Sequence, residues 1–77
     1  MNIDIAFSRK LLSILRAELT AEEKAKLKTS WVWKSYGDHW EFHGPDKFYW
    51  HGRANDAYEA RYKGTSAWRE IEARAKV

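Results

Sequence analysis

A chain of 77 residues has room for one domain, and its 14 basic and 11 acidic side chains give a net charge of +3 at neutral pH, with no block of like charge. The absence of cysteine excludes disulfide bonds, thiolate nucleophiles and cysteine metal ligands. No apolar run approaches the roughly 18 residues that cross a bilayer, and the first residues lack the pattern of a signal peptide. We therefore expect no membrane contact and a location in the cytoplasm.

Turn-forming residues divide the chain into three parts. The single proline and all four glycines lie after residue 36. We predict one α+β domain over residues 1–77, with a helical front at 1–29, a three-stranded antiparallel sheet at 30–53 and a C-terminal helix at 54–77. Five Trp, four Tyr and three Phe supply the dense core that a short chain needs, because it buries only roughly 60–65% of its unfolded surface.

The front contains two predicted helices. Ser8 is the predicted N-cap of the first, because a serine side chain accepts hydrogen bonds from the free backbone N–H groups of a first turn. Thr20 and Glu23 have the spacing of a capping box, which predicts a short second helix through about Lys28. Four leucines at helical spacing predict an apolar stripe toward the core: Leu11, Leu12, Leu15 and Leu19.

The middle of the chain alternates aromatic and polar residues with the period of a strand. Gly37-Asp38 fits a two-residue type II′ turn that pairs Tyr36 with His39. Gly44-Pro45-Asp46 predicts a second turn. If these residues form a three-residue loop, His43 pairs with Lys47. The three strands predicted around these turns are Ser30–Tyr36, His39–His43 and Lys47–His51.

The two predicted turns fix which side chains share a face. They pair Trp33 with Phe42, Lys34 with Glu41, Phe42 with Phe48, and His39 with His51. The face predicted to enter the core carries Trp31, Trp33, Trp40, Phe42, Phe48 and Trp50. The opposite, outer face carries Val32, Lys34, Tyr36, His39, Glu41, His43, Lys47, Tyr49 and His51.

The last segment predicts a helix that covers the aromatic face of the sheet. Asn55 is its predicted N-cap, with acidic residues in the first turn that follows. Gly64 has two interpretations: it ends this helix, with Ser66 capping another, or it lies within one long helix where the backbone packs closely on a Trp of the sheet. We favour one long helix, broken or kinked near Gly64, with an apolar line that includes Trp68 and Ile71.

The outer face of the sheet is the predicted binding site. It combines cations, flat phenol rings and imidazoles, which suit contact with another macromolecule. The alternative is that the N-terminal helices cover this face and leave no site. The predicted binding residues are Lys34, Tyr36, His39, His43, Lys47, Tyr49, His51 and Arg53.

Catalytic and metal chemistry are not expected. The sequence has no nucleophile elbow, phosphate-binding glycine loop or calcium loop, so we expect no enzyme and no cofactor. His39, His51 and Glu41 on one face form the best candidate for a divalent ion, but histidines on a strand are more often solvated sheet residues. We therefore expect no metal site.

Two resemblances bear on function. Three strands followed by a helix that reads Ala54-Asn55-Asp56-Ala57-Tyr58-Glu59-Ala60-Arg61 resemble the layout of plant ethylene-responsive-factor DNA-binding domains and phage integrase arm-binding domains. This resemblance covers about residues 30–64 and implies a sheet that enters the major groove, although the Arg-rich strands of those families are missing. The stretch Trp40–Trp50, with the helix after it, resembles small phage and mobile-element proteins, which implies binding to a host enzyme.

The sequence thus leads to two hypotheses. The first is a non-enzymatic regulatory protein of phage or mobile-element type that binds and modulates a host protein: a polymerase, a nuclease or a defence complex. The alternative is a nucleic-acid-binding module that uses the basic and aromatic outer face. We expect a monomer or a weak homodimer, since spare apolar surface on the first helix can self-associate.

Overall fold

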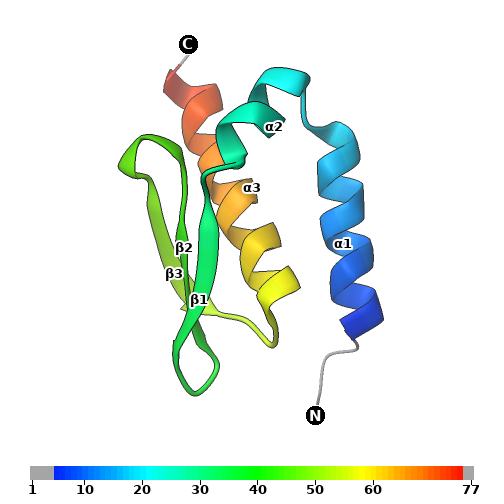
Figure 1. The fold of residues 1–77 in the computed structure, drawn as a ribbon, viewed down its shortest axis with the longest axis vertical. Helices are drawn as coiled ribbons and strands as arrows, with labels where there is room; N and C mark the ends of the chain where they lie inside the picture. The colour runs from blue at the N-terminus through cyan, green and yellow to red at the C-terminus, as the bar shows by residue number, and fades with distance from the viewer. Residues whose placement is uncertain (1–4, 76–77) are drawn as a thin grey trace.

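A computed structural model describes residues 5–75 and has the α+β architecture predicted above (Figure 1). Two helices precede a three-stranded antiparallel sheet of order β1-β2-β3, and a third helix follows it. Along the chain the elements are α1 (Ile5–Glu18), α2 (Ala21–Leu27), β1 (Trp31–Tyr36), β2 (His39–His43), the 3-10 turn η1 (Pro45–Lys47), β3 (Tyr49–Arg53) and α3 (Ala57–Ala75).

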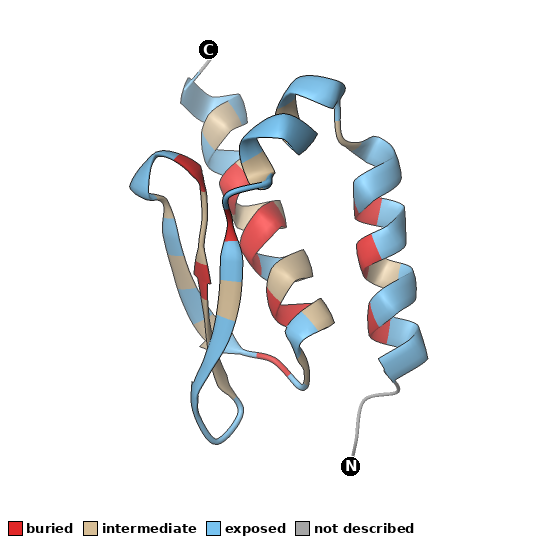
Figure 2. Cartoon of the chain, in the orientation of Figure 1, coloured by how far each residue is buried: buried red, intermediate tan, exposed pale blue. Residues whose placement is uncertain are grey.

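The elements form three layers with α3 in the middle. One side of α3 packs against all three strands, and its other side packs against α1 (Figure 1). Figure 2 shows that buried positions concentrate where the sheet and α1 meet α3. The core consists of Leu12, Leu15, Phe42, Ala54, Ala60 and Trp68.

Helix α1 differs from prediction at its start. Ser8 is not the N-cap: it lies inside the helix, is fully buried, and its hydroxyl has no hydrogen-bond partner among the described residues. Ser8 has helical spacing with Leu12 and Leu15, and all three are buried, so its small side chain occupies a core position. The apolar stripe is confirmed at Leu12 and Leu15, while Ile14 lies half exposed on the other side.

Helix α2 begins as predicted. The Thr20 hydroxyl accepts a hydrogen bond from the Glu23 backbone N–H at 3.1 Å, and the Glu23 carboxylate accepts one from the Thr20 N–H at 2.8 Å. Arg69 of α3 reaches the Glu23 carboxylate at 3.4 Å and Glu18 at 3.7 Å. The backbone hydrogen bond from Thr20 lowers the pKa of Glu23, with a smaller contribution from Arg69. These contacts fix the α1–α2 corner to α3.

The first hairpin contains an irregularity that the sequence analysis missed. Tyr36 pairs with His39 across Gly37-Asp38, and Gly37 has a φ of 51°, as a glycine-initiated two-residue turn requires. The register then shifts between Lys34 and Tyr36. A bulge of one residue turns every earlier side chain of its strand to the opposite face. Beyond it the pairs are Lys34 with Trp40, Trp33 with Glu41, Val32 with Phe42, and Trp31 with His43.

The predicted inner face is therefore wrong for β1. Trp31 and Trp33 point away from α3 and are 54% and 56% exposed, while Val32 and Lys34 lie on the face that contains Phe42. The predicted pair of Lys34 with Glu41 does not form, because these two side chains lie on opposite faces of the sheet.

The second hairpin has a longer loop than predicted. Gly44 donates its N–H to the Phe48 carbonyl at 2.8 Å, and Asp46 and Lys47 take positive φ values of 53° and 64°. His43 consequently pairs with Tyr49 rather than with Lys47, and Phe42 pairs with Trp50 rather than with Phe48.

Sheet and helix meet most closely at Gly64. A Cβ atom at this position would lie 2.2 Å from Cγ of Phe42, which is fully buried. The interpretation of Gly64 as a close-packing position within one long helix is confirmed, with Phe42 in place of the expected Trp. The expected break near Gly64 is wrong, because α3 is continuous from Ala57 to Ala75. Ile71, expected on the apolar line, is half exposed.

The start of α3 is one residue later than predicted. The Asp56 carboxylate accepts the Glu59 backbone N–H at 2.8 Å, so Asp56 caps the helix. Asn55 instead donates its backbone N–H and its side-chain amide to Glu59, at 2.9 and 3.2 Å. The buried Glu59 carboxylate is thereby satisfied at the corner between β3 and α3.

Candidate functional site

The outer face of the sheet is the face turned away from α3, and no helix of the described residues packs on it. Helix α1 lies on the far side of α3 from the sheet (Figure 1), which overturns the alternative that the N-terminal helices cover this face. The strand registers give its members, and Tyr36 stacks on its edge: Trp31, Trp33, Tyr36, His39, Glu41, His43, Tyr49, His51 and Arg53.

Ring contacts connect these side chains across the three strands. Trp31 and His43 stack with centroids 4.6 Å apart and planes 4° from parallel, and Tyr36 and His39 stack at 5.2 Å and 9°. Tilted contacts of 5.1 to 5.6 Å link the remaining rings. The complete row runs in the order Trp31, His43, Tyr49, His51, His39 and Tyr36. Contacts with neighbouring rings limit the rotamers of these side chains.

Glu41 is the acidic group of this face and sits on the central strand. Hydrogen bonding from the Trp33 side chain lowers the pKa of Glu41, and Tyr49 and His43 act in the same direction. The Nε2 atom of His43 lies 3.3 Å from the Glu41 carboxylate. Desolvation and the neighbouring Glu41 raise the pKa of the Tyr49 hydroxyl, so Tyr49 stays an uncharged donor. Glu41 thus orients aromatic side chains from all three strands.

The structure brings together six of the eight predicted site residues: Tyr36, His39, His43, Tyr49, His51 and Arg53. The other two lie elsewhere. Lys34 is on the α3 side of the sheet because of the bulge, and Lys47 is in η1 outside the strands. Among the lysine and arginine side chains of the described strands, that of Arg53 alone therefore lies on this face. Its Nε atom lies 3.4 Å from the Asp38 carboxylate.

Sequence reasoning missed Trp31 and Trp33 as site residues. The predicted register of the first hairpin placed both on the aromatic inner face, and the bulge in β1 overturns that placement. A signal against this was present, because a single helix follows the sheet and cannot bury six aromatic side chains of about 150–250 Å² each. The bulge itself is supported by the Ser35 hydroxyl, which donates to the His39 carbonyl at 3.1 Å.

Two of the three histidines, His39 and His51, form a close pair on the outer face. His51 Nδ1 and His39 Nε2 lie 3.2 Å apart, so one ring donates a proton that the other accepts. Among the described residues, no group of three or more His, Cys, Asp or Glu side chains is arranged to hold a metal ion. Over residues 5–75, no helix is both long enough and apolar enough to span a bilayer.

No protein-family model, curated protein or solved structure matches this chain. The two resemblances drawn from the sequence therefore remain expectations.

Proposed function

We propose that this chain is a non-enzymatic binding protein that places the outer face of its sheet against a protein partner. The observation that carries the proposal is the exposed row of aromatic and imidazole rings together with Trp33 on the same face. The side chains of Trp31, Trp33, Tyr36 and Tyr49 are all about half exposed or more. Contiguous exposed aromatic surface of this kind is unusual on a monomer, and Trp and Tyr are the side chains that dominate binding energy at protein interfaces.

Charge favours a protein over a nucleic acid. A nucleic-acid site neutralises several phosphates with lysine and arginine side chains. Here Lys34 and Lys47 lie off the face, Arg53 is close to Asp38, and Glu41 has a lowered pKa that keeps it anionic at neutral pH. The nucleic-acid alternative retains one supporting observation, which is that flat exposed rings can stack on unpaired bases.

The finer expectation, a phage or mobile-element regulator of a host polymerase, nuclease or defence complex, rests on the sequence resemblance. It adds a class of partner to the proposal above.

An affinity capture from host lysate with three baits tests the proposal. The wild-type chain is compared with the double variant Trp31→Ala/Trp33→Ala and with Ile14→Ala, which removes an equally exposed apolar side chain from α1. We expect one protein to bind the wild type and Ile14→Ala but not the double variant. Equal capture by all three baits would contradict the proposal.

A fluorescence titration with single- and double-stranded DNA and RNA at about 50 and 200 mM salt tests the alternative. We expect no saturable binding by the wild-type chain. Binding that collapses at the higher salt and is lost in Trp31→Ala/Trp33→Ala would replace the protein partner with a nucleic acid.

A further inference from the structure

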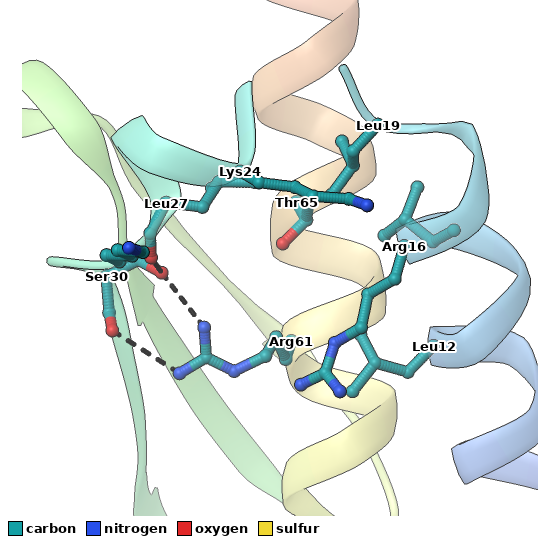
Figure 3. A pocket seen from close by; sticks show the side chains of 10 residues that line it. Leu12, Arg16, Leu19, Lys24, Leu27, Ser30, Arg61 and Thr65 are labelled. Carbon is teal, nitrogen blue, oxygen red and sulfur yellow. Dashed lines mark hydrogen bonds between the residues drawn. The ribbon is translucent and has the colours of Figure 1, made fainter. Parts of the chain in front are cut away.

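A concave region lies on the other side of α3, remote from the outer face of the sheet (Figure 1). Helices α1, α2 and α3 and the entry to β1 line an open cavity of about 470 Å³. Figure 3 shows Arg16 from α1 and Arg61 from α3 extending into this space, with Lys24 from α2 reaching across it. This volume falls in the range of small-molecule sites, roughly 300–1,000 Å³.

The charged side chains that line the cavity are all cationic. They are Arg16, Lys24, Lys28 and Arg61, and the lining contains no Asp or Glu. The nearby acidic side chains form ion pairs with cations outside the cavity lining: Glu18 and Glu23 pair with Arg69, and Glu22 and Glu72 pair with Lys26. None of the four cations forms an ion pair with a residue that the structure describes, so positive charge is concentrated here without an internal counterion.

Arg61 is the most constrained of these cations. It is partly buried and donates to Ser30, from Nη1 to the hydroxyl at 2.9 Å and from Nη2 to the carbonyl at 3.4 Å. A guanidinium has five N–H donors, so these two bonds leave donors free. Burial lowers the pKa of Arg61, and repulsion from Arg16 lowers it further. An anion between the two guanidinium groups would remove this repulsion and accept hydrogen bonds from both.

The remainder of the lining is largely apolar. It includes four leucines from α1, α2 and the turn between these helices: Leu12, Leu15, Leu19 and Leu27. Leu12 and Leu15 are almost fully buried and form the base of the cavity, whereas the cations come from all three helices around it. A simple inorganic anion would leave the partly exposed Leu19 and Leu27 in contact with water.

We propose that the cavity between α1, α2 and α3 binds a small amphipathic anion, whose carboxylate or phosphate group lies between Arg16 and Arg61 and whose hydrocarbon part covers the leucines. Lys24 and Lys28 add long-range attraction for the anionic group. This site is separate from the outer face of the sheet, and its occupancy does not depend on the proposed function.

Nuclear magnetic resonance titration of the isotope-labelled full chain tests the proposal, with leucine methyl and arginine side-chain signals as the readout. The probes are decanoate and decyl phosphate, each kept below the concentration at which it forms micelles. Decanol and inorganic phosphate separate the two halves of the ligand. We expect saturable shifts at Leu15 and Leu27 with one or both amphipathic anions, and much weaker binding of decanol and phosphate. Comparison of the two anions identifies the preferred head group.

Two variants of α1 make the test specific. Arg16→Gln removes a cation from the cavity, whereas Lys10→Gln removes one from an exposed position of the same helix outside the cavity. Loss of a charge-assisted hydrogen bond should weaken binding of the amphipathic anion about tenfold or more in Arg16→Gln and leave Lys10→Gln near wild type. Arg16 is exposed, so this substitution is not expected to unfold the chain.

Three results would overturn the proposal. The first is the absence of saturable shifts with either anion. The second is equal binding of decanol, which would reduce the cavity to an apolar pocket, or equal binding of inorganic phosphate, which would leave the leucines without a role. The third is an equal effect of Arg16→Gln and Lys10→Gln, which would attribute binding to net charge.

Discussion

The two faces of the sheet are both aromatic, yet they have opposite roles. The inner face packs Phe42 against Gly64 of α3, so tightly that no side chain fits at the glycine. The outer face holds Trp31 and Tyr49 in a row of contacting rings, with Trp33 exposed on the same face, and no described element covers them. Aromatic content therefore does not identify the core of a small domain. Strand register decides which rings are buried, and the bulge in β1 sets that register here.

The largest expected difference between the faces is in the cost of removing a ring. Phe42→Ala should lower the free energy of unfolding by about 3–5 kcal/mol, because it empties a fully buried site. Trp33→Ala should cost only about 1 kcal/mol, since the indole is more than half exposed. Urea unfolding of both variants measures the two values. Equal losses would mean that β1 has no bulge and that Trp33 is in the core.

The close contact at Gly64 provides the next effect. Gly64→Ala introduces a Cβ that overlaps the Cβ and Cγ atoms of Phe42. The forced displacement should cost about 1–3 kcal/mol, more than the roughly 1 kcal/mol that alanine gains over glycine in a helix. Thermal unfolding should show a lower midpoint than wild type. The double variant Gly64→Ala/Phe42→Leu, which frees space at the ring, should show a smaller additional loss than the sum of its single changes. An unchanged midpoint for Gly64→Ala would disprove the close packing.

A smaller effect is expected away from both faces. Thr20→Ala removes one half of the capping box of α2 and should destabilise the chain by about 1 kcal/mol. Thr29→Ala, which changes an exposed threonine after the same helix, is the matched control and should have about half this effect or less. Equal changes in the urea midpoint would argue against a specific role for the cap.

The smallest effect concerns acid stability. The folded-state pKa of Glu41 is lowered, so ionised Glu41 stabilises the fold above the ordinary carboxyl pKa, and this contribution is lost as the pH falls through the lowered value. Glu41→Gln should therefore reduce the loss of stability between about pH 7 and pH 3, while Glu23, whose pKa is also lowered, still contributes a loss in the same direction. Urea unfolding across this range measures the slope, and an unaltered slope would show that the contacts of Glu41 do not favour its ionised form.

The register errors explain how much of the site could be predicted. The prediction for β3 was wrong by two residues in pairing, yet Tyr49 and His51 still lie on the outer face, because a shift of two preserves the side-chain alternation. The error in β1 was a single residue, and it exchanged Trp31 and Trp33 with Val32 and Lys34. The fold class, the first turn and the capping box of α2 depend on local sequence and were confirmed.

The remaining features depend on contacts or conformations that a local pattern does not encode. Asp46 and Lys47 adopt positive φ values, which are uncommon for residues other than glycine, so the longer second loop had no sequence signal. The bulge is accompanied by a hydrogen bond across the first hairpin, from the Ser35 hydroxyl to the His39 carbonyl, which the alternation of strand residues does not encode. The cavity between the helices arises from side chains far apart in sequence, such as Arg16 and Arg61, which no spacing rule connects.

Oxidative footprinting of the five Trp side chains in the free protein, at a concentration where it is monomeric, tests the central claim most directly. If the outer face is aromatic and uncovered, Trp31 and Trp33 will be modified fastest and the buried Trp68 slowest, with Trp40 and Trp50 between them. If Trp31 and Trp33 are protected to the same degree as Trp68, the aromatic face is buried and the proposed binding surface does not exist.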